Sequence, residues 1–215
     1  MFLIAGAIVL AKDFELESNL VWIDLEMTGL DPERHVILEI ACIITDNMLD
    51  IVAEGPNIAI NHPDRTLSLM DAWSREHHQI SGLLDKSKDS PCNCRMAEKE
   101  VLDFLSKYCS KGMSPLCGNS VWQDRRFLIK YMPDLEDFLN YRNIDISSIK
   151  ELAKRWYPAL PHFKKTKQHL AMDDIRESIK ELNFYRKHIF TCGGDHIVIR
   201  QNQEDVSGKS WLIPD

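Results

Sequence analysis

The chain has no excess of positive charge. Its 215 residues contain 26 Lys and Arg against 33 Asp and Glu, so the formal net charge is -7. A charge balance of this kind argues against a protein that holds long duplexes by neutralising many phosphates. It does not exclude a nucleic-acid enzyme in which bound metal ions supply the local positive charge.

The cysteines lack the spacing of a disulfide framework or of a zinc site. Cys92 and Cys94 are separated by a single residue, which is too tight for a zinc knuckle. Reduced structural thiols are therefore expected, in a reducing compartment such as the cytoplasm or the mitochondrion. The six cysteines are Cys42, Cys92, Cys94, Cys109, Cys117 and Cys192.

Hydrophobic runs long enough to span a bilayer are also missing, so no membrane association is expected. The apolar residues 1–11 are too few to cross one. They resemble the hydrophobic part of a signal peptide, but they lack its basic start and the arginines of a transit peptide. We treat 1–18 as a leader of unknown role, 19–190 as one domain and 191–215 as an irregular tail.

Hydrophobic periodicity predicts an α/β domain. Three strands are expected at 19–26, 35–45 and 50–60, with short turns that favour an antiparallel meander. Ser147 is expected to cap one of the later helices. Further strands are expected at 114–117 and 141–146, and helices at 66–80, 94–109, 121–132, 147–156 and 170–189. The result is a mixed five-stranded sheet flanked by helices.

Two acids interrupt the first strand, in the stretch NLVWIDLEMTGL at 19–30. Because alternate residues of a strand point to the same side, Asp24 and Glu26 share a face. Two such carboxylates repel each other, and the pKa of one rises unless a cation lies between them. Alone, this stretch is better explained by two solvated acids at the end of a strand.

Two further segments place polar side chains at helix starts. Asp124 lies in the first turn of the helix expected at 121–132, and His169 precedes Asp173 and Asp174 at the start of the last helix. Taken singly, these acids are explained by the helix dipole, and His169 by an exposed surface position. Spacing alone does not choose between Asp173 and Asp174.

Together, these segments offer four carboxylates and one histidine. Two divalent ions would balance four negative charges, and oxygen ligands suit Mg²⁺ or Mn²⁺. Such a pair of ions activates a water and stabilises the leaving oxygen in phosphodiester hydrolysis. A histidine can accept the proton of the attacking water. The set therefore predicts a metal-dependent phosphodiesterase.

Four blocks between 19 and 190 resemble the oligoribonuclease family, the DEDDh branch of the 3′→5′ exonucleases, which has a ribonuclease H-like fold. The blocks are W-I-D-L-E-M-T-G-L at 22–30, C-G-N-S-x-x-x-D-R-R-F at 117–127, Y-R-x-x-D at 141–145 and H-x-A-M-D-D-I-R-E-S at 169–178. The resemblance implies that His169 is the general base. It selects Asp174 over Asp173, because the family's histidine lies five positions before the last metal acid. The implied metal ligands are Asp24, Glu26, Asp124 and Asp174.

The resemblance also implies a homodimer that degrades very short RNA, down to dinucleotides, to nucleoside 5′-monophosphates. Leu30 and Trp73 match positions that wedge or stack the two bases. Tyr141 matches one that reaches over from the second subunit. The positions that match a cap around the 5′ phosphate are His78, Ser120, Arg142 and Ser147, with His77 as the alternative to His78.

Two features depart from the family pattern or vary within it. Trp122 occupies a place where the family has a smaller or polar residue, close to Asp124. Lys164, Lys165 and Lys167 form a loop that is either a phosphate-attracting flap or an ordinary solvated segment. Two other readings remain open: a broader exonuclease of the proofreading type, which acts on longer strands or DNA, and a binding module that keeps only the fold.

Overall fold

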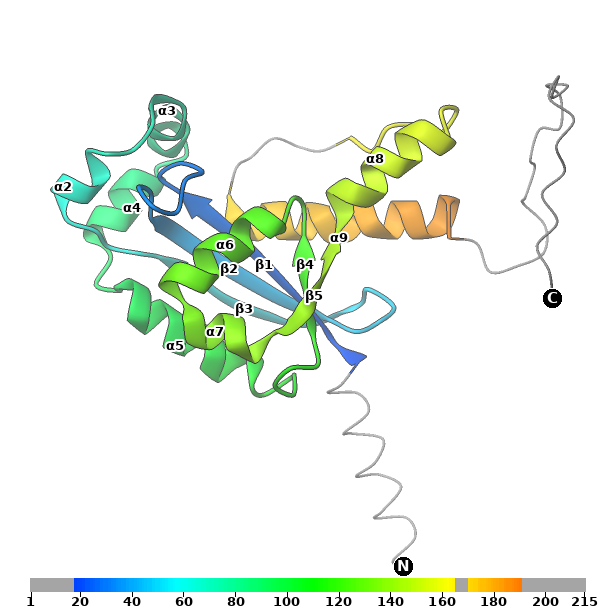
Figure 1. Cartoon of the computed structure of the whole chain (residues 1–215), viewed down its shortest axis with the longest axis horizontal. Coiled ribbons are helices and arrows are strands. Elements are labelled where there is room, and N and C mark those ends of the chain that lie inside the picture. The colour runs from blue at the N-terminus through cyan, green and yellow to red at the C-terminus, as the bar shows by residue number, and fades with distance from the viewer. Residues whose placement is uncertain (1–17, 165–169, 191–215) are drawn as a thin grey trace, which may run out of the picture.

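The computed structural model describes residues 18–164 and 170–190. Five strands form one mixed sheet in the order β3-β2-β1-β4-β5 (Figure 1). The first three make the expected antiparallel meander, and β4 and β5 add to β1 in parallel. Their bounds are β1 (Leu20–Met27), β2 (Ile37–Thr45), β3 (Ile51–Ala59), β4 (Pro115–Gly118) and β5 (Asn140–Asp145).

The expected mixed sheet flanked by helices is confirmed. The helices are α2 (Asp64–Leu67), α3 (Ala72–Ile80), α4 (Leu83–Asp89), α5 (Cys94–Leu105), α6 (Trp122–Tyr131), α7 (Pro133–Phe138), α8 (Ile146–Trp156) and α9 (Ala171–His188). None of these described helices is both long and apolar enough to cross a membrane. Outside the described residues lie the leader except for Ser18, and the tail at 191–215. Outside them also lie Lys165, Lys167 and His169.

Two expectations about helices were wrong. The helix expected at 66–80 is two helices, because the Asp71 side chain accepts a hydrogen bond from the Ser74 amide and starts α3 anew. Asp145, not Ser147, caps α8 and accepts the Ser147 amide at 2.9 Å. Pro133 begins α7, a further helix that follows α6, since proline fits the first turn of a helix.

The two faces of β1 pack against different helices. Val21, Ile23 and Leu25 belong to a core shared with α5, α6 and α7. Trp22 belongs to a second core, which contains Ile175 of α9 and Ile146 of α8. Because strand residues alternate, Asp24 and Glu26 continue the Trp22 side, beside the N-terminal end of α9. The fold thus carries both acids to the place where α9 begins.

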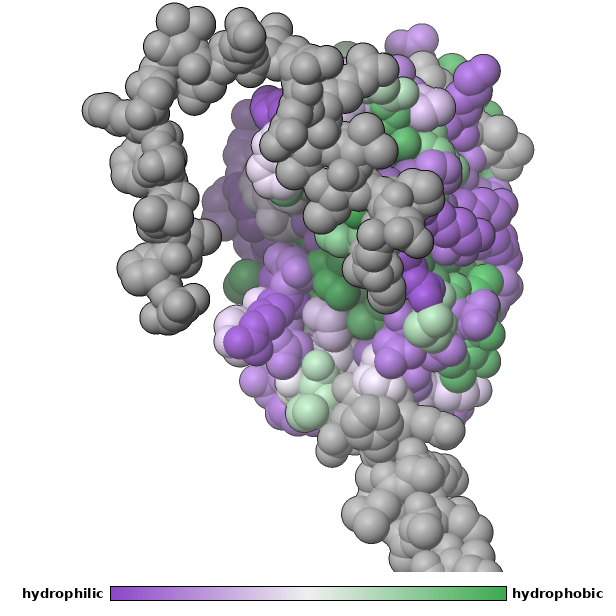
Figure 2. All heavy atoms as spheres, turned by 90° about the vertical axis from the view of Figure 1, so that its right-hand side faces the viewer, coloured by the Kyte–Doolittle hydropathy of each residue, from purple (hydrophilic) through white to green (hydrophobic). Residues whose placement is uncertain are grey.

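The far ends of α8 and α9 lie on the side of the molecule shown in Figure 2. This face mixes hydrophilic side chains with smaller hydrophobic areas (Figure 2). Trp156, at the end of α8, is one of the exposed apolar residues, with 67% of its surface accessible.

Candidate active site

Three of the four expected acids lie together. Asp24 and Glu26 come from β1, and Asp174 comes from the first turn of α9. Each offers a carboxylate oxygen, and these oxygens all lie within 4.8 Å of one another. The packing of Ala171 and Ile175 of α9 into the core that contains Trp22 holds the helix in this place. The neighbouring Asp173 instead pairs with Arg176 at 2.9 Å.

The fourth acid, Asp124, accepts a hydrogen bond from the backbone of Leu25, the residue between Asp24 and Glu26. Strands β1 and β4 pair only at Val21–Leu116 and Trp22–Cys117. Farther along β1, the Leu25 amide donates to Asp124 Oδ1 at 3.1 Å. Asp124 is buried in the first turn of α6, so its carboxylate is fixed where the two parallel strands part. Ligands commonly bind at the carboxyl ends of strands at such a switch point.

The cluster holds too much negative charge for its degree of burial. Burial, followed by the charges of Asp174, Glu39 and Asp124, raises the pKa of Glu26 to about 8. Burial also raises the pKa of Asp124 to about 7, although the hydrogen bond from Leu25 opposes the change. A divalent cation would compensate this repulsion. The donor set of carboxylate oxygens fits a hard cation such as Mg²⁺ or Mn²⁺.

Of the two histidines expected in the site, the structure describes His78 but not His169. His169 lies outside the described residues, so its role as general base stays a prediction. His78 is buried, with Nε2 at 2.8 Å from the Met27 carbonyl and Nδ1 at 3.9 Å from a Glu26 oxygen. Burial lowers the pKa of His78, which favours the neutral ring. His78 thus lies beside the acids, and its phosphate contact stays a prediction.

The structure brings Ser120 and Ser147 together. Their hydroxyl oxygens are 3.1 Å apart, and both backbone amides donate to Asp145 Oδ1 at 2.9 Å. Ser120 takes a φ of 54°, which is unusual for a residue with a side chain. We call these two hydroxyls and the constrained turn at Ser120 the hydroxyl corner. Arg142 and Tyr141 lie exposed on β5, with the guanidinium 4.5 Å from the ring centroid.

The two residues expected to contact bases are exposed. Leu30 and Trp73 show 67% and 63% of their surfaces to solvent. The Asp71 amide donates to the Thr28 carbonyl at 3.1 Å, which ties the start of α3 to the turn before Leu30. The Trp73 ring stacks on His77, with centroids 3.8 Å apart. His77 therefore supports Trp73 and is less buried than His78.

The sequence interpretation missed Glu39. This acid lies opposite Glu26 on β2 and is only 3% exposed. It accepts a hydrogen bond of 3.4 Å from the Ala171 amide at the start of α9, where Leu170 makes no side-chain cap. The signal was an acid in the middle of an otherwise apolar strand, which is costly unless it has a partner.

Comparisons with known proteins identify the family of the chain. A family model described as exonuclease matches residues 21–182. The oligoribonuclease of Haemophilus influenzae (strain PittGG) is 56% identical over 80% of this chain and 95% of its own length. That of Marinobacter nauticus is 58% identical over 80% of this chain and 97% of its own length. The chain belongs to the oligoribonuclease family. It is therefore a nuclease that hydrolyses phosphodiester bonds.

Solved structures confirm the fold expected for the oligoribonuclease family. Exonuclease I of E. coli with a 5cy-dA13 oligonucleotide has a TM-score of 0.60 at 13% identity, over 79% of this chain. Exonuclease I of Methylocaldum szegediense has a TM-score of 0.58 at 15% identity, over 80% of this chain. The chain spans about two fifths of each of them, 40% and 41%. At these identities the likeness shows the ribonuclease H-like fold alone.

Proposed function

We propose that the chain is a 3′→5′ exoribonuclease that hydrolyses very short oligoribonucleotides, down to dinucleotides, to nucleoside 5′-monophosphates. The observation that carries the proposal is the convergence of Asp24, Glu26 and Asp174, with oxygens within 4.8 Å of one another. Asp124 is fixed beside them by the Leu25 amide. Identity above one half to curated oligoribonucleases supports the choice of short RNA as substrate.

The four acids would hold two divalent cations, Mg²⁺ or Mn²⁺. When bound, such ions supply charge compensation and make a water more acidic. The role of the protein is to hold the acids in position. Strand β1 sets the spacing of Asp24 and Glu26, and α9 brings Asp174 onto the same face. His169 would accept the proton from the attacking water.

The other expected residues would bind the bases and the 5′ phosphate of the substrate and so select its length. Leu30 and Trp73 would contact the two bases, since stacking on an exposed aromatic ring stabilises single-stranded substrates. The hydroxyl corner, with Arg142 and His78, would hold the 5′ phosphate. Tyr141, 74% exposed in this single chain, would reach the site of the second subunit in a homodimer.

A digestion experiment tests the substrate. A 5′-labelled RNA dinucleotide and a 20-mer are compared under single turnover, with Mn²⁺ and with chelator. We expect rapid, metal-dependent loss of the dinucleotide and slow loss of the 20-mer. Preference for the 20-mer would overturn the proposed substrate, and activity in chelator would overturn the metal dependence.

The second candidate is a broader 3′→5′ exonuclease that acts on longer single strands or DNA. It is favoured by the likeness to exonuclease I, which has been solved with oligonucleotides. Arg142 distinguishes the two, because it is exposed next to Tyr141 and outside the acid cluster. If short RNA is the substrate, Arg142→Ala should lower dinucleotide cleavage about tenfold more than cleavage of long strands, the loss of one charged hydrogen bond. Equal losses on both substrates would favour the broader enzyme.

A further inference from the structure

The side-chain amide of Asn119 joins three segments of the fold. Asn119 lies in the turn between β4 and α6, and its Nδ2 donates to Ser178 Oγ at 2.8 Å and to Glu181 Oε2 at 3.3 Å, both on α9. Its Oδ1 accepts a hydrogen bond from Ser147 Oγ of α8 at 3.2 Å. Both ends of one half-buried amide are therefore used, one toward α9 and the other toward the hydroxyl corner.

On α9, the contacts of Asn119 fall on the same stripe as Asp174. Residues 174, 178, 181 and 185 are spaced so that they lie along one face of a helix. Ser178 Oγ donates to the Asp174 carbonyl at 2.8 Å. The amide of Asn119 is thus two hydrogen bonds away from the backbone of a metal acid.

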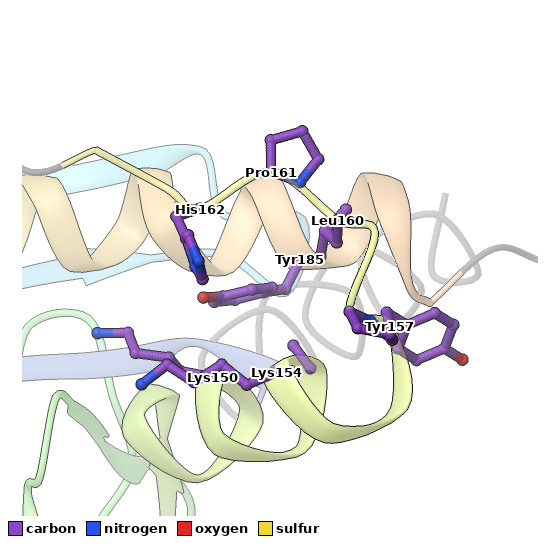
Figure 3. A pocket seen from close by; sticks show the side chains of 9 residues that line it. Lys150, Lys154, Tyr157, Leu160, Pro161, His162 and Tyr185 are labelled. Atoms are coloured by element: carbon purple, nitrogen blue, oxygen red, sulfur yellow. The ribbon is translucent and has the colours of Figure 1, made fainter.

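Glu181, one of the hydrogen-bond partners of Asn119, is itself held in place by neighbouring side chains. Its side chain is only 1% exposed, and it pairs with Lys150 of α8 at 2.9 Å. The Tyr185 hydroxyl donates to it at 3.4 Å. Figure 3 shows Lys150 and Tyr185 lining the same pocket between α8 and α9. Because a buried carboxylate is costly unless it is paired, these partners hold Glu181 and hence its contact with Asn119 in one geometry.

We propose that Asn119 is a positioning residue that fixes the distance between the hydroxyl corner and the metal acids, and thereby selects short substrates with a 5′ phosphate. This inference rests on the proposed function, in which that corner holds the 5′ phosphate. In a dinucleotide, the 5′ phosphate and the scissile phosphate are a single nucleotide apart. A site that recognises both must hold its two halves at a constant separation. The Asn119 amide connects the two halves, directly to Ser147 of the corner and through Ser178 to the backbone of Asp174.

The test compares two substrates, a diribonucleotide with a 5′ phosphate and the same diribonucleotide with a 5′ hydroxyl. We expect wild type to have the higher kcat/KM on the first. Asn119→Ala should reduce this preference about tenfold, mainly through KM, the size expected for the loss of hydrogen bonds that orient the corner. A change in stability alone would lower both activities together and leave the preference unchanged.

Asn61→Ala is the matched control. The Asn61 side-chain amide likewise joins distant segments, but it donates to the backbone carbonyls of Ser87 and Lys88 at 3.0 and 2.8 Å, and neither is a site residue. It should keep the wild-type preference for the 5′ phosphate. If Asn119→Ala does not fold, Asn119→Ser takes its place, since the shorter side chain cannot span from Ser147 to Ser178 and Glu181.

A double variant shows whether Asn119 acts through Ser147. Because coupled residues are not additive, Asn119→Ala should add little to the loss of 5′-phosphate preference in Ser147→Ala. Additive losses would overturn the inference. So would an unchanged preference in a folded Asn119 variant, provided that wild type shows the preference. Wild type that ignores the 5′ phosphate overturns the inference and the proposed phosphate site together, and wild type that spares dinucleotides overturns the proposed function.

Discussion

The acid cluster and the base-contact region of this molecule are built in opposite ways. Asp124 is 6% exposed, and it is held by the Leu25 amide. Leu30 and Trp73 are 67% and 63% exposed; the Leu30 carbonyl accepts from Gln123 Nε2 at 2.6 Å, and the Trp73 ring stacks on His77. The chemistry is thus preorganised inside the fold, whereas the recognition of bases is left to an open surface. Preorganised electrostatics contribute to catalysis because they need no rearrangement during the reaction.

The largest expected effect comes from the cluster. Asp174→Ala should lower single-turnover cleavage by about a thousandfold or more, while the fold persists because the variant removes a repelling charge. Asp173→Ala is the matched control. Asp173 is the adjacent acid, paired with Arg176 rather than with the cluster, so this variant should retain nearly full activity. Equal losses in the two variants, or wild-type turnover in Asp174→Ala, would contradict the assignment.

A smaller effect is expected in the base-contact region. Trp73→Ala should raise KM for a dinucleotide by roughly 5- to 100-fold, the range for the loss of one stacked base. The rate of the bound substrate should change less, because the acids remain in place. Trp156→Ala removes a tryptophan that is also 67% exposed, but from the end of α8, and it should leave KM unchanged. A loss in kcat with constant KM in Trp73→Ala would contradict the proposed division of roles.

A further effect, which leaves the reaction itself aside, concerns stability in the metal-free protein. In the folded chain the pKa of Glu26 is raised from 4.5 to about 8, so folding favours its protonated form. This contribution is complete below about pH 4.5 and is lost as the pH rises through about 8. Glu26→Gln cannot ionise, and it should therefore show a weaker fall of Tm with rising pH in chelator. The check is thermal unfolding of both proteins at several pH values, and identical pH profiles would contradict the pKa of Glu26.

The two regions also differ in how far sequence predicts them. Asp24 and Glu26 follow from strand alternation, because two acids at i and i+2 of an apolar strand must share a face. Asp174 was chosen over Asp173 by the family pattern, and the structure adds a physical reason, since Asp173 turns to Arg176. The base contacts came from the resemblance alone, because an exposed Trp73 has no local pattern that separates recognition from surface.

Contacts between distant segments were beyond prediction. Glu39 meets the Ala171 amide 132 positions away, and Asn119 meets Glu181 62 positions away. The hydrophobic periodicity of a single segment does not predict such pairs. The predicted cap of α8 was wrong because Asp145 and Ser147 are both good cap residues, and the structure uses Asp145. The strands and long helices were predicted because their hydrophobic periods repeat over many residues.

Calorimetric titration of Mn²⁺ into the metal-free chain tests the central claim, that the four acids form one divalent-metal site. Wild type and Asp173→Asn should bind about two ions per chain, as expected for a two-ion hydrolase. Asp174→Asn should lose at least one of them, because its carboxylate contributes one of the clustered oxygens. Mn²⁺ binding by Asp174→Asn with the stoichiometry and affinity of wild type would contradict the account.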